Sequence, residues 1–195
     1  MDALPDSAPL HVAAPPERFF GYYPGTVAVV TAAHAGRRTV MAAGWHAALS
    51  SAPPLYGVAV GPERFTHDLL VASGAFAVHF LPFERAAAVA GVGTLSGRDV
   101  DKFARFDLAT RPGAALDVPI LQDAYLAYEC RLTARHAVGD HDWVVGEVVA
   151  LHHRPDAFDA RRMLDPTHVR PFVYYGRSRY QPFGDAAVAE HRVEV

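Results

Sequence analysis

Residues 41–70, MAAGWHAALSSAPPLYGVAVGPERFTHDLL, contain the strongest local signals in the chain. The stretch begins as an apolar strand, passes through small residues to Ser50 and Ser51, and stops at two prolines. The segment LYGVAV at 55–60 has the apolar, β-prone composition of a buried strand. A helical pattern then runs from about residue 66 to residue 73 and ends before Gly74, as many helices do. We therefore expect a strand, an irregular loop, a second strand and a helix, in this order.

The flanking segments add more strands than helices. Residues 26–32 and 40–44 are typical of a hairpin around His34-Ala35-Gly36-Arg37, in which Gly36 suits a positive φ. Further strands are expected at 75–81, 125–137 and 143–153, and the last two should pair antiparallel through the Gly-Asp turn of VGDHD. Helices are expected at 84–90 and 100–106, separated by the glycine-rich link GVGTLSG. About seven strands with few helices predict a mainly β fold, a closed or split β-barrel with a Greek-key-like antiparallel order.

Length and composition describe an ordinary globular protein. The 195 residues suit one domain, which we assign to residues 18–182 between an N-terminal arm at 1–17 and a C-terminal tail at 183–195. The net charge of -3 gives no electrostatic reason to expect nucleic acid or a membrane surface as partner, and no run approaches the ~18 apolar residues of a membrane helix. A secretory signal is missing and Cys130 is the only cysteine, so we expect a cytoplasmic protein.

The turn before the predicted helix has the character of an anion site. Thr66 suits the N-cap position, where free backbone N–H groups and the helix dipole favour negative charge. Arg64 and His67 can add positive charge, so the turn would suit a phosphate. Taken alone, the same turn is also typical of an ordinary capped helix with a surface arginine.

The segment GWHAALSSAPP favours a ligand with a flat ring. A strand that breaks into small residues leaves backbone N–H and C=O groups in need of partners, and Ala47 and Ala48 permit close approach. A flavin has the shape and the polar edge for such a loop. Trp45 can form a wall for the ring or simply fill the core.

Several blocks of sequence, in order, resemble the FMN-binding split barrels of the flavin reductase-like family. They are GTVAVVTA, WHAALSSAPPLYGVAVGPERFTHDLL, SGAFAVHF, DVDKF, YECRL and GDHDWVVGEV, and the resemblance runs from about Phe20 to Tyr180. It implies an FMN-binding split β-barrel that takes a hydride from NADH or NADPH and passes electrons to a small-molecule acceptor. The acceptor could be free flavin for a partner monooxygenase component, a ferric chelate or another small molecule.

The resemblance also implies roles for individual residues. The family's ring and ribityl contacts fall on Trp45, His46, Ala47, Ala48, Ser50 and Ser51, and its phosphate contacts fall on Arg64, Phe65, Thr66 and His67. His141, in the Gly-Asp-His turn, would meet the nicotinamide or assist proton transfer. A homodimer is expected, in which residues 174–177 would complete the neighbour's pocket.

Other readings of the sequence stay open. A split-barrel oxidase or sensor could bind FMN or haem without NAD(P)H and would have no role for His141, whereas a plain binding barrel would lose nothing on replacement of Thr66. The eleven histidines have no metal-like spacing, so no metal is expected. Cys130 is expected in the core. Asp101-Lys102-Phe103 could approach a cofactor from a loop, but it is more typical of a capped surface helix.

Overall fold

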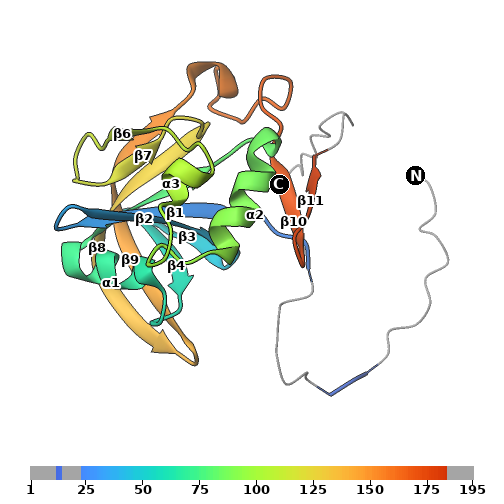
Figure 1. Ribbon diagram of the computed structural model, residues 1–195. Helices are drawn as coiled ribbons and strands as arrows, with labels where there is room; N and C mark the ends of the chain where they lie inside the picture. The colour runs from blue at the N-terminus through green and yellow to red at the C-terminus, as the bar shows by residue number, and fades with distance from the viewer. Residues whose placement is uncertain (1–11, 15–22, 184–195) are drawn as a thin grey trace.

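The computed structural model describes residues 12–14 and 23–183 (Figure 1). The predicted arm and tail lie almost entirely outside these residues, so their bounds stay a prediction. Within the described part of the chain, no helix is long and apolar enough to cross a membrane.

Strands dominate the described residues. The strands are β1 (Ala28–His34), β2 (Arg37–Ala43), β3 (His46–Ser51), β4 (Pro54–Val60), β5 (Ala75–Phe80), β6 (Thr110–Pro112), β7 (Pro119–Leu121), β8 (Leu126–Val138), β9 (His141–His153), β10 (Phe172–Gly176) and β11 (Arg179–Pro182). The α-helices are α1 (Phe65–Ser73), α2 (Ala86–Thr94) and α3 (Lys102–Arg105), and the short 3₁₀ helices are η1 (Phe83–Arg85) and η2 (Pro155–Ala157). Seven strands form one antiparallel sheet in the order β2-β1-β5-β8-β9-β4-β3. The mainly β fold with about seven antiparallel strands is confirmed.

Tight turns set the register of the two hairpins that the sequence predicts. Ala35 and Gly36 join β1 to β2 with φ angles of 50° and 75°, which suit a two-residue turn between twisted strands. Gly139, with a φ of 66°, begins the turn that joins β8 to β9, and these two strands pair along almost their whole length. Both predicted hairpins are confirmed.

Two apolar clusters cover opposite faces of the sheet. Inside the curved sheet, Leu69 and Leu70 of α1 pack with core side chains of the strands, among them Phe76 and the predicted core residue Cys130. Burial raises the pKa of the Cys130 thiol to about 12, so it stays a neutral core side chain. On the other face, α2, α3 and β10 cover β1 and β2 (Figure 1).

The structure corrects the predicted end of the second helix. Helix α2 continues to Thr94, through the glycines that the sequence analysis assigned to a link. A Cβ atom on Gly91 would lie 2.2 Å from the ring of Phe106, so the glycine lets the segment after α3 pack directly on the helix. This glycine is explained by close packing and does not mark the end of the helix.

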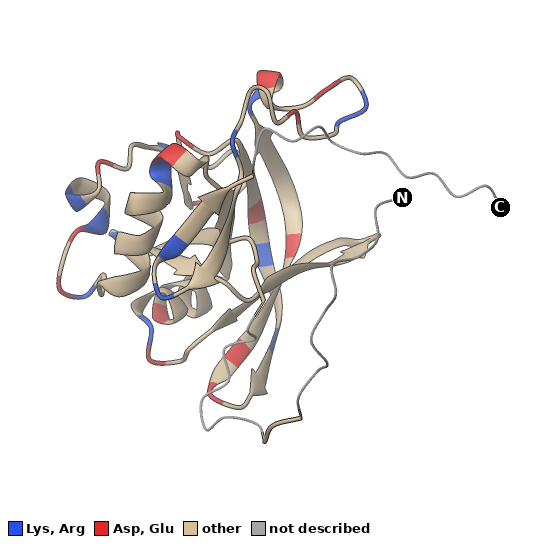
Figure 2. Cartoon of the chain, turned by 90° about the vertical axis from the view of Figure 1, so that its right-hand side faces the viewer, with Lys and Arg blue, Asp and Glu red and all other residues tan. Residues whose placement is uncertain are grey.

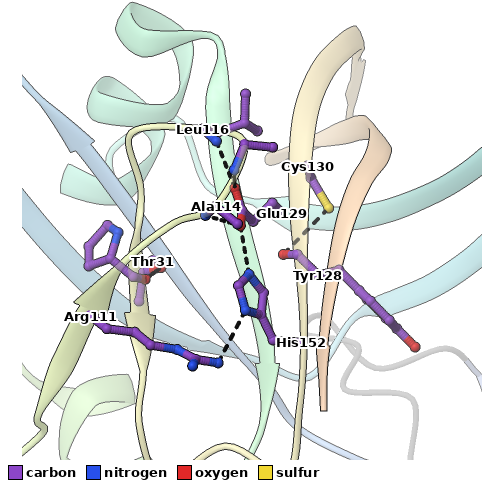
Figure 3. A network of polar contacts seen from close by, with 10 residues as sticks. Thr31, Arg111, Ala114, Leu116, Tyr128, Glu129, Cys130 and His152 are labelled. Atoms are coloured by element: carbon purple, nitrogen blue, oxygen red, sulfur yellow. Dashed lines mark hydrogen bonds and ion pairs between the residues drawn. The ribbon is translucent and has the colours of Figure 1, made fainter.

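A buried carboxylate holds the loop between β6 and β7 against the sheet (Figure 3). Glu129 of β8 is completely buried and accepts hydrogen bonds from the amides of Ala114, Ala115 and Leu116 at 2.6 to 2.9 Å. His152 of β9 lies 2.6 Å from the same carboxylate and also contacts Arg111. One acidic side chain therefore accepts hydrogen bonds from three consecutive amides of the loop, while Leu116 and Val118 pack in an apolar cluster with the sheet.

Candidate functional site

A cavity of about 1110 Å³ lies where α1, β2, the β10–β11 hairpin and the segment after α2 (residues 95–101) meet. Its lining includes five of the predicted site residues and many that the sequence analysis did not single out. The lining residues are Tyr23, Gly25, Thr26, Thr39, Met41–Trp45, Ala59, Gly61, Glu63–Thr66, Val92–Arg98, Lys102, His141, Tyr174–Arg177 and Arg179.

Small residues of β2 form part of the cavity wall. Ala42, Ala43 and Gly44 follow one another there, so a flat ligand could approach the backbone closely. The hydroxyl of Thr39 is buried at the same wall and has no hydrogen-bond partner among the described residues. It lies under Gly97, where a Cβ atom would come within 2.5 Å of the Thr39 oxygen. Gly97 therefore permits the close approach of the segment after α2.

The N-terminus of α1 opens onto the cavity. The helix begins at Phe65 with Arg64 as N-cap, so the prediction of Thr66 as the capping residue was wrong. Thr66 lies inside the first turn and is buried. The amides of Phe65 and Thr66 make no hydrogen bond to the described part of the chain. Two free donors at the positive end of a helix, beside Arg64, retain the anion-binding character that the sequence suggests.

Two further cations line the cavity near this helix end: Arg98, which sequence reasoning missed, and Lys102, whose approach to a cofactor was the less favoured interpretation. The Arg98 guanidinium donates to Asp68 and to the carbonyl of Glu63, each at 2.7 Å. Lys102 Nζ donates to the carbonyls of Val92 and Leu95 at 2.9 and 3.1 Å, which caps the end of α2.

The Lys102 segment is only partly as expected. Asp101 caps α3 by accepting from the amides of Phe103 and Ala104, as predicted, but Lys102 is buried rather than on the surface. Burial, and after it the charge of Arg64, lowers the pKa of Lys102 to about 8. The motif Asp-Lys-Phe was the available signal, because a lysine next to a helix cap can reach the carbonyls of a neighbouring helix.

Trp45 and His141 stand together at another part of the lining. Their ring centroids lie 5.1 Å apart at an angle of 59°, and Trp45 is 40% exposed, so it is not a core residue. His141 is the first residue of β9, and its Nδ1 lies 2.7 Å from the carboxylate of Asp140. An aromatic surface and a histidine held by one ring nitrogen therefore face the same cavity.

The predicted flavin loop is a strand. Ala47, Ala48, Ser50 and Ser51 belong to β3, at the edge of the sheet, so the expectation of an irregular loop was wrong. The strand pairs with β4 and carries only one irregularity, near Leu49. Because β3 has a neighbour on one side only, its other backbone edge is unpaired with strands of the described residues. None of these four residues lines the cavity, and their contact with a cofactor stays a prediction.

His46 and His67 do not line the cavity either. His46 Nδ1 lies 2.7 Å from the hydroxyl of Tyr56 and its Nε2 3.2 Å from the carbonyl of Thr26. Burial lowers the pKa of His46, with the bond to Thr26 acting in the opposite direction. His67 Nε2 lies 2.8 Å from Asp142 of β9, and both side chains are about one-tenth exposed. In this chain the two histidines tie elements of the fold together beside the cavity.

The C-terminal hairpin lines the cavity of its own chain. Residues 174–177, which the sequence analysis expected in a neighbour's pocket, contribute to this wall together with Arg179. Tyr174 and Tyr180 pack with Phe172 against the apolar cluster that includes α2. The hairpin is thus part of the domain.

Comparisons with known proteins agree with this architecture. Residues 20–184 match the flavin reductase-like domain family. An uncharacterized protein of Aeropyrum pernix is 35% identical over 158 residues, which span 80% of this chain and 59% of that protein. The NADH:riboflavin 5'-phosphate oxidoreductase of Streptomyces pristinaespiralis is 31% identical over 82% of this chain and 81% of its own. The crystal structure of an FMN-binding protein from Thermus thermophilus with bound cyclohexenone has 36% identity and a TM-score of 0.82, covering 94% of this chain and all of that one.

These matches define the fold as a split β-barrel of the FMN-binding class. The chain belongs to the flavin reductase-like family. A cavity with several cations, two free helix amides and a wall of small residues is chemically suited to a flat cofactor that carries a phosphate.

Proposed function

We propose that this protein is an FMN-dependent NAD(P)H:flavin reductase, which transfers a hydride from a reduced nicotinamide and passes electrons to a small acceptor. One observation carries the proposal: a single cavity joins a cationic helix end to the Trp45–His141 pair. The name of the Streptomyces relative supports NADH as donor, and that of the Thermus protein supports FMN.

The helix end is suited to the phosphate of FMN. Arg64 and the amides of Phe65 and Thr66 supply donors at the positive end of α1. Lys102 adds a buried ammonium whose own hydrogen bonds fix its position. A phosphate dianion would replace the water around these donors with charge-assisted hydrogen bonds, which are stronger than neutral ones.

The opposite part of the cavity is suited to the ring. When bound, FMN accepts the hydride and carries the reducing equivalents to the acceptor. Ala42, Ala43 and Gly44 leave space for a flat ring, and Trp45 offers an aromatic surface beside it. Because Asp140 holds Nδ1 of His141, Nε2 is the ring nitrogen that can take up or release a proton.

Further parts of the proposal concern contacts and partners. We expect the free edge of β3, with Ala47, Ala48, Ser50 and Ser51, to contribute ring and ribityl contacts in addition to the cavity wall. His46 and His67 would act indirectly, by holding Tyr56 and Asp142. A homodimer, a cytoplasmic location and a partner monooxygenase that receives reduced flavin complete the proposal.

An anaerobic absorbance scan of the FMN-loaded protein tests the proposed function. NADH or NADPH should bleach the protein-associated flavin band, and the better donor is identified by its rate. His141→Asn should slow the bleaching about tenfold or more, whereas His136→Asn, on an exposed part of β8, should leave it unchanged. A bound flavin that stays oxidised with both donors would favour an oxidase or sensor, and a protein that binds no flavin would overturn the proposal.

A further inference from the structure

The cavity is strongly cationic in a protein of net charge -3. Five basic residues line it, Arg64, Arg98, Lys102, Arg177 and Arg179, against one acidic residue, Glu63. The first three lie at the start of α1, in the segment between α2 and α3, and at the start of α3, and the last two belong to the β10–β11 hairpin. Figure 2 shows basic residues at the tip of this hairpin.

The two groups of cations differ in their partners. Arg64 is paired with Glu63, Arg98 with Asp68, and Lys102 with two carbonyls. By contrast, the side chains of Arg177 and Arg179 make no ion pair or hydrogen bond to any residue between 23 and 183. Both are exposed at the cavity rim. Two cations close in sequence, without a counter-charge in the part of the chain that the structure describes, form a site for a separate anion.

The backbone at the tip of the hairpin has positive φ angles, which arginine and serine rarely adopt. Gly176, Arg177 and Ser178 have φ angles of 90°, 51° and 60°, all in the left-handed region. A turn of this kind favours Asn-Gly or Asp-Gly, because side chains with a Cβ atom are strained there. Ala35 has a similar φ of 50° in the β1–β2 turn, so the turn geometry holds Arg177 at the cavity rim but does not by itself mark a ligand contact.

The cavity is also large for one ligand. Its volume of about 1110 Å³ exceeds the range of roughly 300 to 1,000 Å³ that is common for a single bound small molecule. A cofactor with one phosphate needs only one of the two cationic groups. The group at α1 has the helix amides and the buried lysine, so it is the better phosphate site.

We propose that Arg177 and Arg179 bind the diphosphate of a nicotinamide dinucleotide, while FMN occupies the site at α1. This inference rests on the proposed function and identifies the part of the chain that recognises the donor. The sequence has no G-x-G-x-x-G fingerprint of a dinucleotide-binding fold, so cationic side chains at the rim must supply the recognition.

The double variant Arg177→Gln/Arg179→Gln tests the inference in the FMN-loaded protein. The affinity for FMN should change by less than about twofold, because its phosphate lies at the other group. The KM for NADH should rise about tenfold or more with kcat nearly constant, since a rim charge acts on binding of the donor. The rate with 1-benzyl-1,4-dihydronicotinamide, a donor without phosphate, should be unchanged. The matched control Arg105→Gln/Arg162→Gln removes two exposed charges outside the cavity lining and should behave as the wild type.

A direct binding measurement separates this inference from the proposed function. ADP-ribose carries the diphosphate without the nicotinamide, and calorimetry should show its affinity for the FMN-loaded protein falling about tenfold in the double variant. If neither donor reduces the flavin but ADP-ribose binds and the variant loses it, the reductase proposal fails and the diphosphate site stands. The site would be overturned if the wild-type protein did not bind ADP-ribose, or if the double variant bound it as tightly as the wild type. It would also be overturned if the double variant lost as much rate with the benzyl donor as with NADH, or if only the KM for the electron acceptor rose.

Discussion

The charge of Lys102 depends on pH in the range where the protein can be studied. Its pKa of about 8 reflects first burial and then the charge of Arg64, both of which disfavour the ammonium form. A bound phosphate favours the ammonium form, so the lysine is more basic in the complex than in the free protein. FMN affinity should therefore be constant below the free-state pKa and fall roughly tenfold between about pH 8 and about pH 9.5, as measured by quenching of flavin fluorescence.

The matched variant for this pH dependence is Lys102→Arg. A guanidinium stays charged throughout the range, so the affinity of this variant should be nearly independent of pH. Lys102→Met should bind FMN about tenfold more weakly at pH 7 and should also be insensitive to pH. If the fall in affinity above pH 8 persists in Lys102→Arg, another group is responsible.

Two buried threonines differ in how much their hydroxyl groups should contribute to the stability of the fold. Thr31 Oγ1 donates to the carbonyl of Pro119 at 2.6 Å, whereas Thr39 Oγ1 has no partner among the described residues. Thr31→Val should lower the free energy of unfolding by about 1 kcal/mol, because it removes the hydrogen bond to the partly buried carbonyl of Pro119. Thr39→Val should leave it unchanged or raise it slightly in the FMN-free protein. Urea unfolding measures both, and an equal loss for the two variants would contradict the contrast.

The loop between β6 and β7 depends on Glu129 of β8 (Figure 3). Burial acts to raise the pKa of Glu129, but hydrogen bonds from His152 and from three backbone amides outweigh it and lower the pKa below 4.5. Glu129→Gln places an amide group among these donors and should lower the free energy of unfolding by about 3 kcal/mol at pH 7. Since the folded pKa is the lower one, this contribution is present above about pH 4.5 and is lost as the pH falls further.

An exposed glutamate nearby is the control for Glu129. Glu147 of β9 lies 3.6 Å from Arg131, and both side chains are well exposed. Glu147→Gln should change the free energy of unfolding by no more than about 0.5 kcal/mol. Urea unfolding, together with proteolysis of the loop at 113–118, distinguishes the two variants. Equal stabilities for Glu129→Gln and Glu147→Gln would show that the loop does not depend on the buried carboxylate.

Elements with strong local patterns could be predicted from the sequence, and those set by packing could not. The β1–β2 and β8–β9 hairpins carry turn glycines, and α1 ends at Gly74, so their signals are local. By contrast, β3 pairs with β4 despite its small residues, from His46 opposite Val58 to Ser51 opposite Pro54. Helix α2 continues through Gly91 because Phe106 packs on it, a contact that no local pattern reveals.

The candidate site was predictable in part for the same reason. Arg64, Phe65 and Thr66 are adjacent in sequence, so a helix start that suits a phosphate can be seen directly. Lys102 and Arg177 reach the same cavity from distant segments, and their place depends on how α3 and the β10–β11 hairpin pack against α2. Resemblance to a family identified the site, whereas the packing of the whole domain determines its full set of charges.

The charge distribution of the whole molecule should govern how FMN binding depends on salt. The chain carries a net charge of -3, yet the cavity lining has five cations and one anion, so an anionic ligand is attracted only near the cavity. Raising the salt from about 0.01 M to about 1 M shortens the screening length from roughly 30 Å to 3 Å and should weaken FMN binding about tenfold or more. Riboflavin lacks the phosphate, so its affinity should change much less over the same range. Fluorescence titrations of both ligands measure this difference, and equal salt dependence would show that the cavity cations do not hold the phosphate.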